Sequence, residues 1–117
     1  WNLALDQDSG PTNGGCMGCR GVVTIDSSTS PATITYNVEY YALGQLAKFV
    51  VPGANRVDSS TSSSGSIEDV AFENPDGSIV LCVLNSSTIA EPFSVSWHNT
   101  FFNYTLPAQS VATFVWK

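Results

Sequence analysis

The sequence has few charged residues, and basic residues are the scarcest. Only 12% of the 117 residues are charged, and four are Lys or Arg. These lie far apart along the chain, at Arg20, Lys48, Arg56 and Lys117, and the formal net charge is −6. Isolated basic side chains cannot neutralise a run of phosphates, so we expect neither nucleic acid nor acidic lipid as a partner.

Long apolar runs are also missing. No stretch approaches the roughly 18–20 apolar residues that a bilayer-spanning helix needs, so we expect no membrane span. The sequence contains a single His and no G-x-S-x-G motif. A hydrolase triad built around His98 is therefore not expected, and we interpret His98 as a turn residue.

Hydrophobic residues make up 43% of the sequence, alongside many Ser, Thr, Val and Gly residues. This composition favours a mostly β globular protein, and the length suffices for one modest core. Two sequons, Asn85-Ser86-Ser87 and Asn103-Tyr104-Thr105, make Asn85 and Asn103 glycosylation candidates. They favour a secreted, extracellular protein.

The first third of the chain predicts a strand, a long loop and a hairpin. Residues 1–5 form a short apolar strand that runs directly into a loop rich in Gly, Pro and Asn, at 6–19. The β-branched segments 22–25 and 33–36, separated by a Ser/Thr/Pro turn, are typical of a hairpin.

A helix is predicted from Val38 to Val51. Apolar residues recur there at spacings of three and four, Asn37 can cap the start, and Pro52-Gly53 ends the pattern. Gly44 inside this helix costs about 1 kcal/mol relative to Ala if exposed, so we expect it to pack closely against another element.

The remainder of the chain predicts short strands separated by polar turns. The turn Asn74-Pro75-Asp76-Gly77 joins two of them, and the Ser-rich segment 59–66 is expected to be a loop. The expected strands are 67–73, 78–84, 93–97, 101–106 and 111–116. Strands at this spacing are typical of a β-sandwich.

The motif Cys16-Met17-Gly18-Cys19 has three interpretations. A zinc site needs a second ligand pair, and only Cys82 and His98 are available, far apart in the sequence. A redox dithiol should lead into a helix, whereas a strand follows here. We favour a small disulfide between Cys16 and Cys19, and expect no metal and no cofactor; Cys82 is expected to be a buried free thiol.

Carboxylates could form a sugar-cleaving site and aromatic residues a sugar-binding one. A glycosidase needs two carboxylates about 5–10 Å apart across a sugar ring, and none of the ten Asp and Glu residues is placed convincingly for this. Trp97 and Trp116 are expected in the core. With Phe101, Phe102 and Tyr104 they would form a carbohydrate-binding platform only if several faced solvent.

Several blocks of the sequence together resemble the C-terminal end of family 30 glycoside hydrolases, which include glucosylceramidases and β-1,6-glucanases. The resemblance runs in order through W-N-L-A-L-D, N-V-E-Y-Y-A-L-G-Q-L-A-K-F-V-V-P-G-A-N-R-V, N-P-D-G-S-I-V-L-C-V-L-N and Y-T-L-P-A-Q-S-V-A-T-F-V-W. It covers nearly all of the chain.

The resemblance implies a β-sandwich preceded by the last strand and helix of a (β/α)8 barrel. Residues 1–53 would be the last βα unit, with an excursion over the barrel rim at 6–37, and residues 54–117 the sandwich. It also implies that Trp1, with Asn2 as a neighbour, contacts substrate. The family's catalytic glutamates lie on earlier barrel strands, so we expect no catalytic residue on this chain.

The predicted function is therefore that of the C-terminal segment of a secreted retaining β-glycosidase that hydrolyses β-glucosidic bonds. The expected partners are a β-linked glucan or glucoside substrate and the barrel portion of the same enzyme, and this chain alone should be inactive. The alternative is a stand-alone accessory β-sandwich for carbohydrate binding or structural support. Several solvent-facing aromatic residues would favour that alternative.

Overall fold

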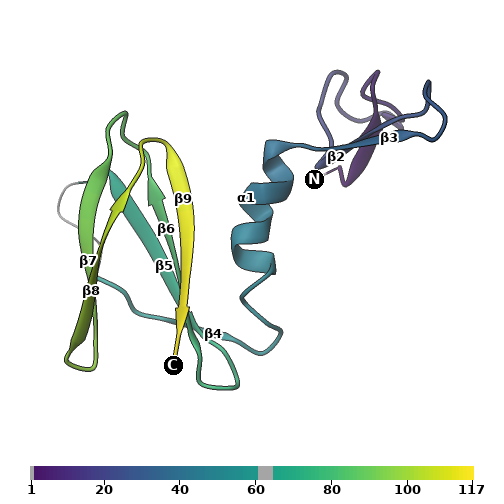
Figure 1. Ribbon diagram of the computed structural model, residues 1–117. Coiled ribbons are helices and arrows are strands. Elements are labelled where there is room, and N and C mark those ends of the chain that lie inside the picture. The colour runs from purple at the N-terminus through teal and green to yellow at the C-terminus, as the bar shows by residue number, and fades with distance from the viewer. Residues whose placement is uncertain (1, 61–64) are drawn as a thin grey trace. The chain divides into compact units, whose positions relative to one another are not determined.

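The computed structural model describes residues 2–60 and 65–117, and Figure 1 shows its helix and strands. The chain forms two compact units, the first ending at Gly44 and the second beginning at Gln45. Strands dominate both units, which confirms the mostly β composition predicted from the sequence.

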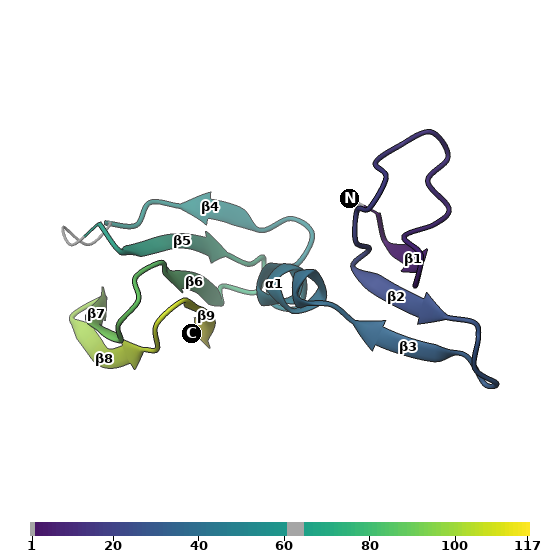
Figure 2. The ribbon, with the colours of Figure 1, turned by 90° about the horizontal axis from the view of Figure 1, so that it is seen from above.

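Unit 1 contains a three-stranded sheet in the order β1-β2-β3, visible in Figure 2. Strand β1 spans Ala4–Asp6, β2 spans Val23–Asp26 and β3 spans Thr33–Tyr36. Strands β1 and β2 are parallel, while β2 and β3 form the predicted hairpin. The parallel pairing is possible because the connection from β1 to β2 is long.

Gly21 lets β1 and β2 come together where their pairing begins. A Cβ at Gly21 would lie 2.8 Å from the backbone nitrogen of Leu5 and 2.7 Å from the carbonyl oxygen of Val23. Real side chains essentially never come this close to backbone atoms. Only glycine therefore fits at this position without moving one of the two strands.

Helix α1 spans Val38–Ala47 and ends four residues before the predicted end at Val51. The backbone N–H groups of Phe49 and Val50 both donate to the Leu46 carbonyl, which tightens the last turn. The N–H of Val51 then donates to the side chain of Asn74 instead of continuing the helix. A tertiary hydrogen bond thus replaces the helical one.

Two expectations about this helix need correction. A Cβ on Gly44 would meet no atom of the described chain within 4 Å, so the predicted close packing at Gly44 is wrong for this chain. Asn37 does precede the helix, but its side-chain amide donates to the Gly21 carbonyl and the Thr24 hydroxyl. The Asn37 side chain therefore fixes the helix start to the sheet of unit 1.

Unit 2 is a β-sandwich of two antiparallel sheets, with strand order β4-β5-β6-β9 in the larger sheet and β7-β8 in the smaller. Its strands are β4 (Asn55–Val57), β5 (Ile67–Glu73), β6 (Ile79–Asn85), β7 (Glu91–Trp97), β8 (Thr100–Leu106) and β9 (Ser110–Trp116). All but β4 were predicted to within two residues. The expected loop 59–66 lies partly outside the described residues.

The core of unit 2 lies between these two sheets. Its buried cluster consists of Ile67, Ala71, Leu81, Val83 and Leu106. Trp116 packs against this cluster, and Trp97 lies 6.3 Å from Trp116 between ring centroids, so both tryptophans lie in or beside the core as expected. Cys82 is a free thiol but only half-buried, and burial raises its pKa.

Two buried asparagines join separate segments of unit 2. The Asn74 side chain accepts a hydrogen bond from the Val51 N–H and donates to the Phe49 carbonyl and the Ser78 hydroxyl. The Asn85 side chain, at the end of β6, donates to the carbonyl oxygens of Ile89, Leu106 and Pro107. Neither structural role was expected from the sequence.

Candidate functional site

The loop that leaves the end of β1 is the first candidate for a site, and Asp6 organises its start. One carboxylate oxygen of Asp6 accepts the backbone N–H of Asp8 at 2.9 Å and that of Gly10 at 2.7 Å. A Cβ on Gly10 would lie 3.0 Å from the other carboxylate oxygen. Asp6 is therefore engaged with its own loop.

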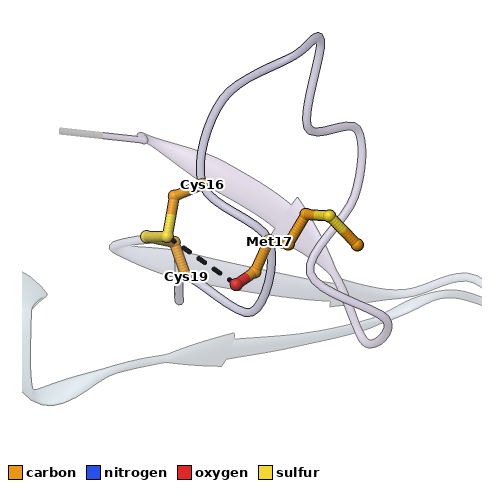
Figure 3. Close-up of a disulfide and its surroundings, with 3 residues drawn as sticks. All are labelled: Cys16, Met17 and Cys19. Carbon is orange, nitrogen blue, oxygen red and sulfur yellow. Dashed lines mark hydrogen bonds between the residues drawn. A yellow bond between two sulfur atoms is a disulfide. The ribbon is translucent and has the colours of Figure 1, made fainter.

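The far end of the same loop is closed by a disulfide between Cys16 and Cys19, shown in Figure 3. The disulfide favoured from the sequence is thus present. The Cys16 sulfur lies 3.9 Å from the Met17 carbonyl oxygen, but as an oxidised sulfur it carries no proton to donate. The Met17 side chain extends away from the disulfide and is 90% exposed.

An ion pair fixes the residue that follows the disulfide. The Arg20 guanidinium donates to Glu39, in the first turn of α1, at 2.7 Å. This hydrogen bond holds the pKa of the Glu39 carboxyl below its ordinary value. Three interactions therefore constrain the loop: the hydrogen bonds to the Asp6 carboxylate, the disulfide and the Arg20–Glu39 ion pair.

Of the two predicted substrate contacts, Trp1 lies outside the described residues. Asn2 is exposed, and its backbone carbonyl accepts the N–H of Val22 at 2.9 Å, which extends the pairing of β1 with β2. The Asn2 side chain makes no hydrogen bond within residues 2–60 and 65–117. Its role toward substrate stays a prediction.

Three carboxylates of the described chain, Asp26, Glu39 and Asp76, accept hydrogen bonds from neighbouring side chains. Asp26, Glu39 and Asp76 have clearly shifted pKa values, and all three are lowered, chiefly by hydrogen bonds from Ser28, Arg20 and Ser78 respectively. A general acid in a glycosidase needs a raised pKa, so these three carboxylates do not fit that role, and the expected absence of a catalytic residue on this chain stays a prediction. Residues 2–60 and 65–117 also contain no cluster of three or more His, Cys, Asp or Glu suited to a metal.

The two exposed aromatic residues in the described part of unit 2, Phe101 and Tyr104, lie on opposite faces of β8 and so do not form a shared solvent-facing platform. Phe102 and Tyr104 each lie 5.2 Å from the Phe114 ring centroid, on the inner side of the sandwich. Phe101 is 72% exposed and points to the other side of β8. It borders an open cavity of about 610 Å³ beside β9. His98, in the β7–β8 turn as expected, packs edge-on against Trp97.

The two predicted glycosylation candidates differ sharply in their surroundings. Asn85 is 0% exposed and uses its amide in three hydrogen bonds, so a glycan on Asn85 does not fit the folded domain. Asn103 lies on the surface of β8. The sequon pattern could not distinguish the two, because it contains no information on which face of a strand the asparagine occupies.

The family model described as the glycosyl hydrolase family 30 β-sandwich domain matches residues 53–114, more than half of the chain. The chain therefore belongs to glycoside hydrolase family 30. The match falls on the sandwich strands of unit 2.

Curated relatives include an endo-1,6-β-D-glucanase of Aspergillus fumigatus, which is 32% identical over 98% of this chain and 24% of its own length. A lysosomal acid glucosylceramidase of Mus musculus is 34% identical over 100% of this chain and 22% of its own length. The chain thus spans about a quarter of the length of these relatives.

In solved structures, too, this chain matches about a quarter of the other chain. An endo-β1,6-glucanase is 37% identical, with a TM-score of 0.87 over 99% of this chain and 26% of the other. SrfJ from Salmonella typhimurium is 31% identical, with a TM-score of 0.92 over all of this chain and 25% of the other. The similarity therefore includes unit 1 as well as the sandwich.

Proposed function

We propose that this chain is the C-terminal segment of a secreted retaining β-glycosidase that hydrolyses β-glucosidic bonds. The observation that carries this proposal is the coverage: nearly all of the chain matches β-glucanases and a glucosylceramidase, but only about a quarter of each relative is matched. The reaction would be a two-step displacement through a glycosyl-enzyme, with both carboxylates on the part of the enzyme outside this chain.

The surface of unit 1 supports the proposal that a larger body covers it. Strand β3 is exposed along its whole length, and α1 contains no buried residue. Large apolar side chains are exposed on these elements: Ile34, Tyr36, Val38, Tyr40 and Tyr41. Contiguous apolar surface of this kind marks an interaction site, and the remainder of a barrel is the partner that we propose for residues 1–53.

Within this proposal, Trp1 and Asn2 contact the sugar, and the loop from Asp6 to Arg20 forms part of the cleft rim. A tryptophan ring can stack on the apolar face of a sugar, and active sites of such barrels lie at the carboxyl ends of the strands. The fixed ends of the loop would keep that rim in one conformation.

Secretion is supported by the disulfide. The described chain also contains no helix long and apolar enough to cross a membrane.

The test is denaturing mass analysis of the protein purified from its natural source, together with hydrolysis assays on β-1,6-glucan and on an aryl β-glucoside. We expect this sequence to occur with a barrel-sized polypeptide of roughly 250 residues or more, in one chain or two, and with activity. Residues 1–117 produced alone should be inactive on both substrates.

Two results would contradict the proposal. Hydrolysis by residues 1–117 alone would place the catalytic carboxylates on this chain. A folded, inactive 117-residue species occurring by itself in the natural source would instead indicate an accessory β-sandwich.

A further inference from the structure

Strand β8 presents three side chains in a row on the outer face of the sandwich. Phe102 and Tyr104 lie toward Phe114 on the inner face of the strand, although Tyr104 is still 43% exposed. Because successive side chains of a strand point to opposite faces, Phe101, Asn103 and Thr105 share the outer face. Neighbouring members of this row are about 7 Å apart, the rise of two strand residues.

The exposure of Phe101 has no explanation inside the described chain. Its side chain is 72% exposed, and it belongs to none of the aromatic pairs found among the described residues. Across the strand pair it lies opposite Ser96, and the same face also presents Ser94, Asn103 and Thr105 together with Pro92. An aromatic ring standing among hydroxyl and amide groups suits the apolar face of a sugar.

The Asn103 side chain is free at the atom that would be modified. Its Oδ1 accepts the Ser94 hydroxyl at 2.6 Å, while its Nδ2 donates no hydrogen bond within the described residues. This hydrogen bond fixes the orientation of the Asn103 side chain. Asn85 is the opposite case, because both Nδ2 hydrogens are shared among buried carbonyls.

We propose that Asn103 is an N-glycan attachment site and that the first N-acetylhexosamine of the glycan packs on the ring of Phe101. The Asn103 Nδ2 forms a bond to C1 of an oligosaccharide carried on a lipid pyrophosphate, in a reaction catalysed by an oligosaccharyl transferase. The bond from C1 to the pyrophosphate oxygen breaks, the lipid pyrophosphate leaves, and the amide loses one proton.

This inference goes beyond the proposed function. It requires that the chain pass through a compartment containing the transferase, but it requires no hydrolytic activity. A negative result in the glycosidase assays would therefore not contradict the glycan proposal. An unmodified Asn103 would likewise not contradict the glycosidase proposal.

The first experiment is secretion of residues 1–117 from a yeast host, followed by peptide mass mapping with and without removal of N-glycans. We expect a glycan on the peptide that contains Asn103 and none on the peptide that contains Asn85. Thr105→Val is the matched variant without a sequon, since it keeps the strand and the Ser94–Asn103 hydrogen bond but should remove the modification. Secreted, folded protein with unmodified Asn103, or with a glycan on Asn85, would overturn the assignment.

The second experiment tests the packing on Phe101 by a double-mutant cycle of Phe101→Ala and Thr105→Val, read as Tm. In the glycosylated form, Phe101→Ala should lower Tm by about 4 °C more than it does in the Thr105→Val background. Phe101→Tyr should restore the difference, because it keeps the ring. Ile89→Ala removes another exposed apolar side chain of unit 2 and should lower Tm equally with and without the glycan. Equal Phe101→Ala effects in the two backgrounds would overturn the packing.

Discussion

Units 1 and 2 bury their apolar residues to very different extents. Among the described residues of unit 1, only Leu5 and Val22 are buried hydrophobic residues, while the other buried hydrophobic residues of the described chain lie on β5, β6 and β8 of unit 2. Unit 2 therefore contains a core of its own. Unit 1 has regular secondary structure but exposes Ile34, Tyr36 and Val38, so its described residues contain no comparable core, in line with the larger partner that we propose.

The largest contrast is expected between Leu106→Ala and Ile34→Ala. Leu106 is 2% exposed in the core of unit 2, so its truncation should cost about 3 kcal/mol of unfolding free energy. Ile34 is 56% exposed on β3, so its truncation should change the stability of this chain by less than about 0.5 kcal/mol. Urea unfolding followed by tryptophan fluorescence measures both.

The same pair can be measured in a complete enzyme that contains this sequence. There, Ile34→Ala should cost about 2 kcal/mol or more, because the partner surface would bury the side chain. If Ile34→Ala has the same small effect in the complete enzyme, the difference between the two units does not arise from a missing partner.

Gly21→Ala is expected to destabilise unit 1 selectively, by up to about 3 kcal/mol. The added methyl group would collide with the backbone of Leu5 and Val23, forcing β1 away from β2. Hydrogen exchange should then speed up for the amide of Val23, which donates to the Leu3 carbonyl, and remain unchanged on β6. The control is Gly44→Ala, because a Cβ at Gly44 would meet no atom of the described chain within 4 Å. Gly65→Ala would not serve as a control, because Gly65 has a φ of 70°, which residues other than glycine rarely adopt.

Removal of the disulfide should have a smaller and more local effect. A double Cys16→Ser, Cys19→Ser variant loses a bridge that closes a four-residue loop, which amounts to no more than about 2 kcal/mol on loop-entropy arithmetic. Proteolysis should increase between Thr12 and Arg20 and nowhere in unit 2. New cleavage within β5 or β6 would contradict a local effect of the disulfide.

The smallest effect expected is the pH dependence of the Arg20–Glu39 pair. Because the folded-state pKa of Glu39 is lowered by the hydrogen bond from Arg20, the pair stabilises the fold above the ordinary glutamate pKa. That contribution is lost as the pH falls through the lowered value. Tm of the parent chain and of Arg20→Ala should therefore differ slightly at neutral pH and converge in acid; curves that stay parallel down to low pH would contradict this.

The sequence predicted most of the strands because local signals determine them. The alternating segment 67–73, the apolar run 78–84 and the turn between them predict β5 and β6 to within one residue. The spacing of the strands and the family resemblance both predicted the sandwich. The end of α1 and the role of Gly44 were wrong, because tertiary contacts decide them: Asn74 takes the Val51 N–H, and nothing in the described chain approaches Gly44. Strand β4 was missed because its three residues, Asn55 to Val57, contain no apolar alternation.

The candidate site was only partly predictable, since pattern does not reveal burial. The spacing of Cys16 and Cys19 indicated the disulfide. The role of the Asp6 carboxylate, which accepts the backbone N–H groups of Asp8 and Gly10, was not predicted from the sequence. An Asp followed four residues later by Gly-Pro is the signal that could have suggested a loop-forming role. For Asn103, the outer-face position follows from counting along β8 once the inner aromatic residues are known.

The buried Asn85 also bears on how the protein ages chemically. Spontaneous deamidation of an asparagine requires the backbone nitrogen of the next residue to attack the side-chain carbonyl carbon. Here the Ser86 nitrogen donates to the Ser66 carbonyl at 2.9 Å, and the Asn85 amide is held by three acceptors. The Asn85 side-chain amide is thus protected from deamidation for as long as the end of β6 stays folded. Each local opening of this end of β6 exposes the amide. Conversion of Asn85 to aspartate would place a negative charge beside the backbone carbonyls that the amide N–H groups had satisfied, so deamidation would make the next opening easier.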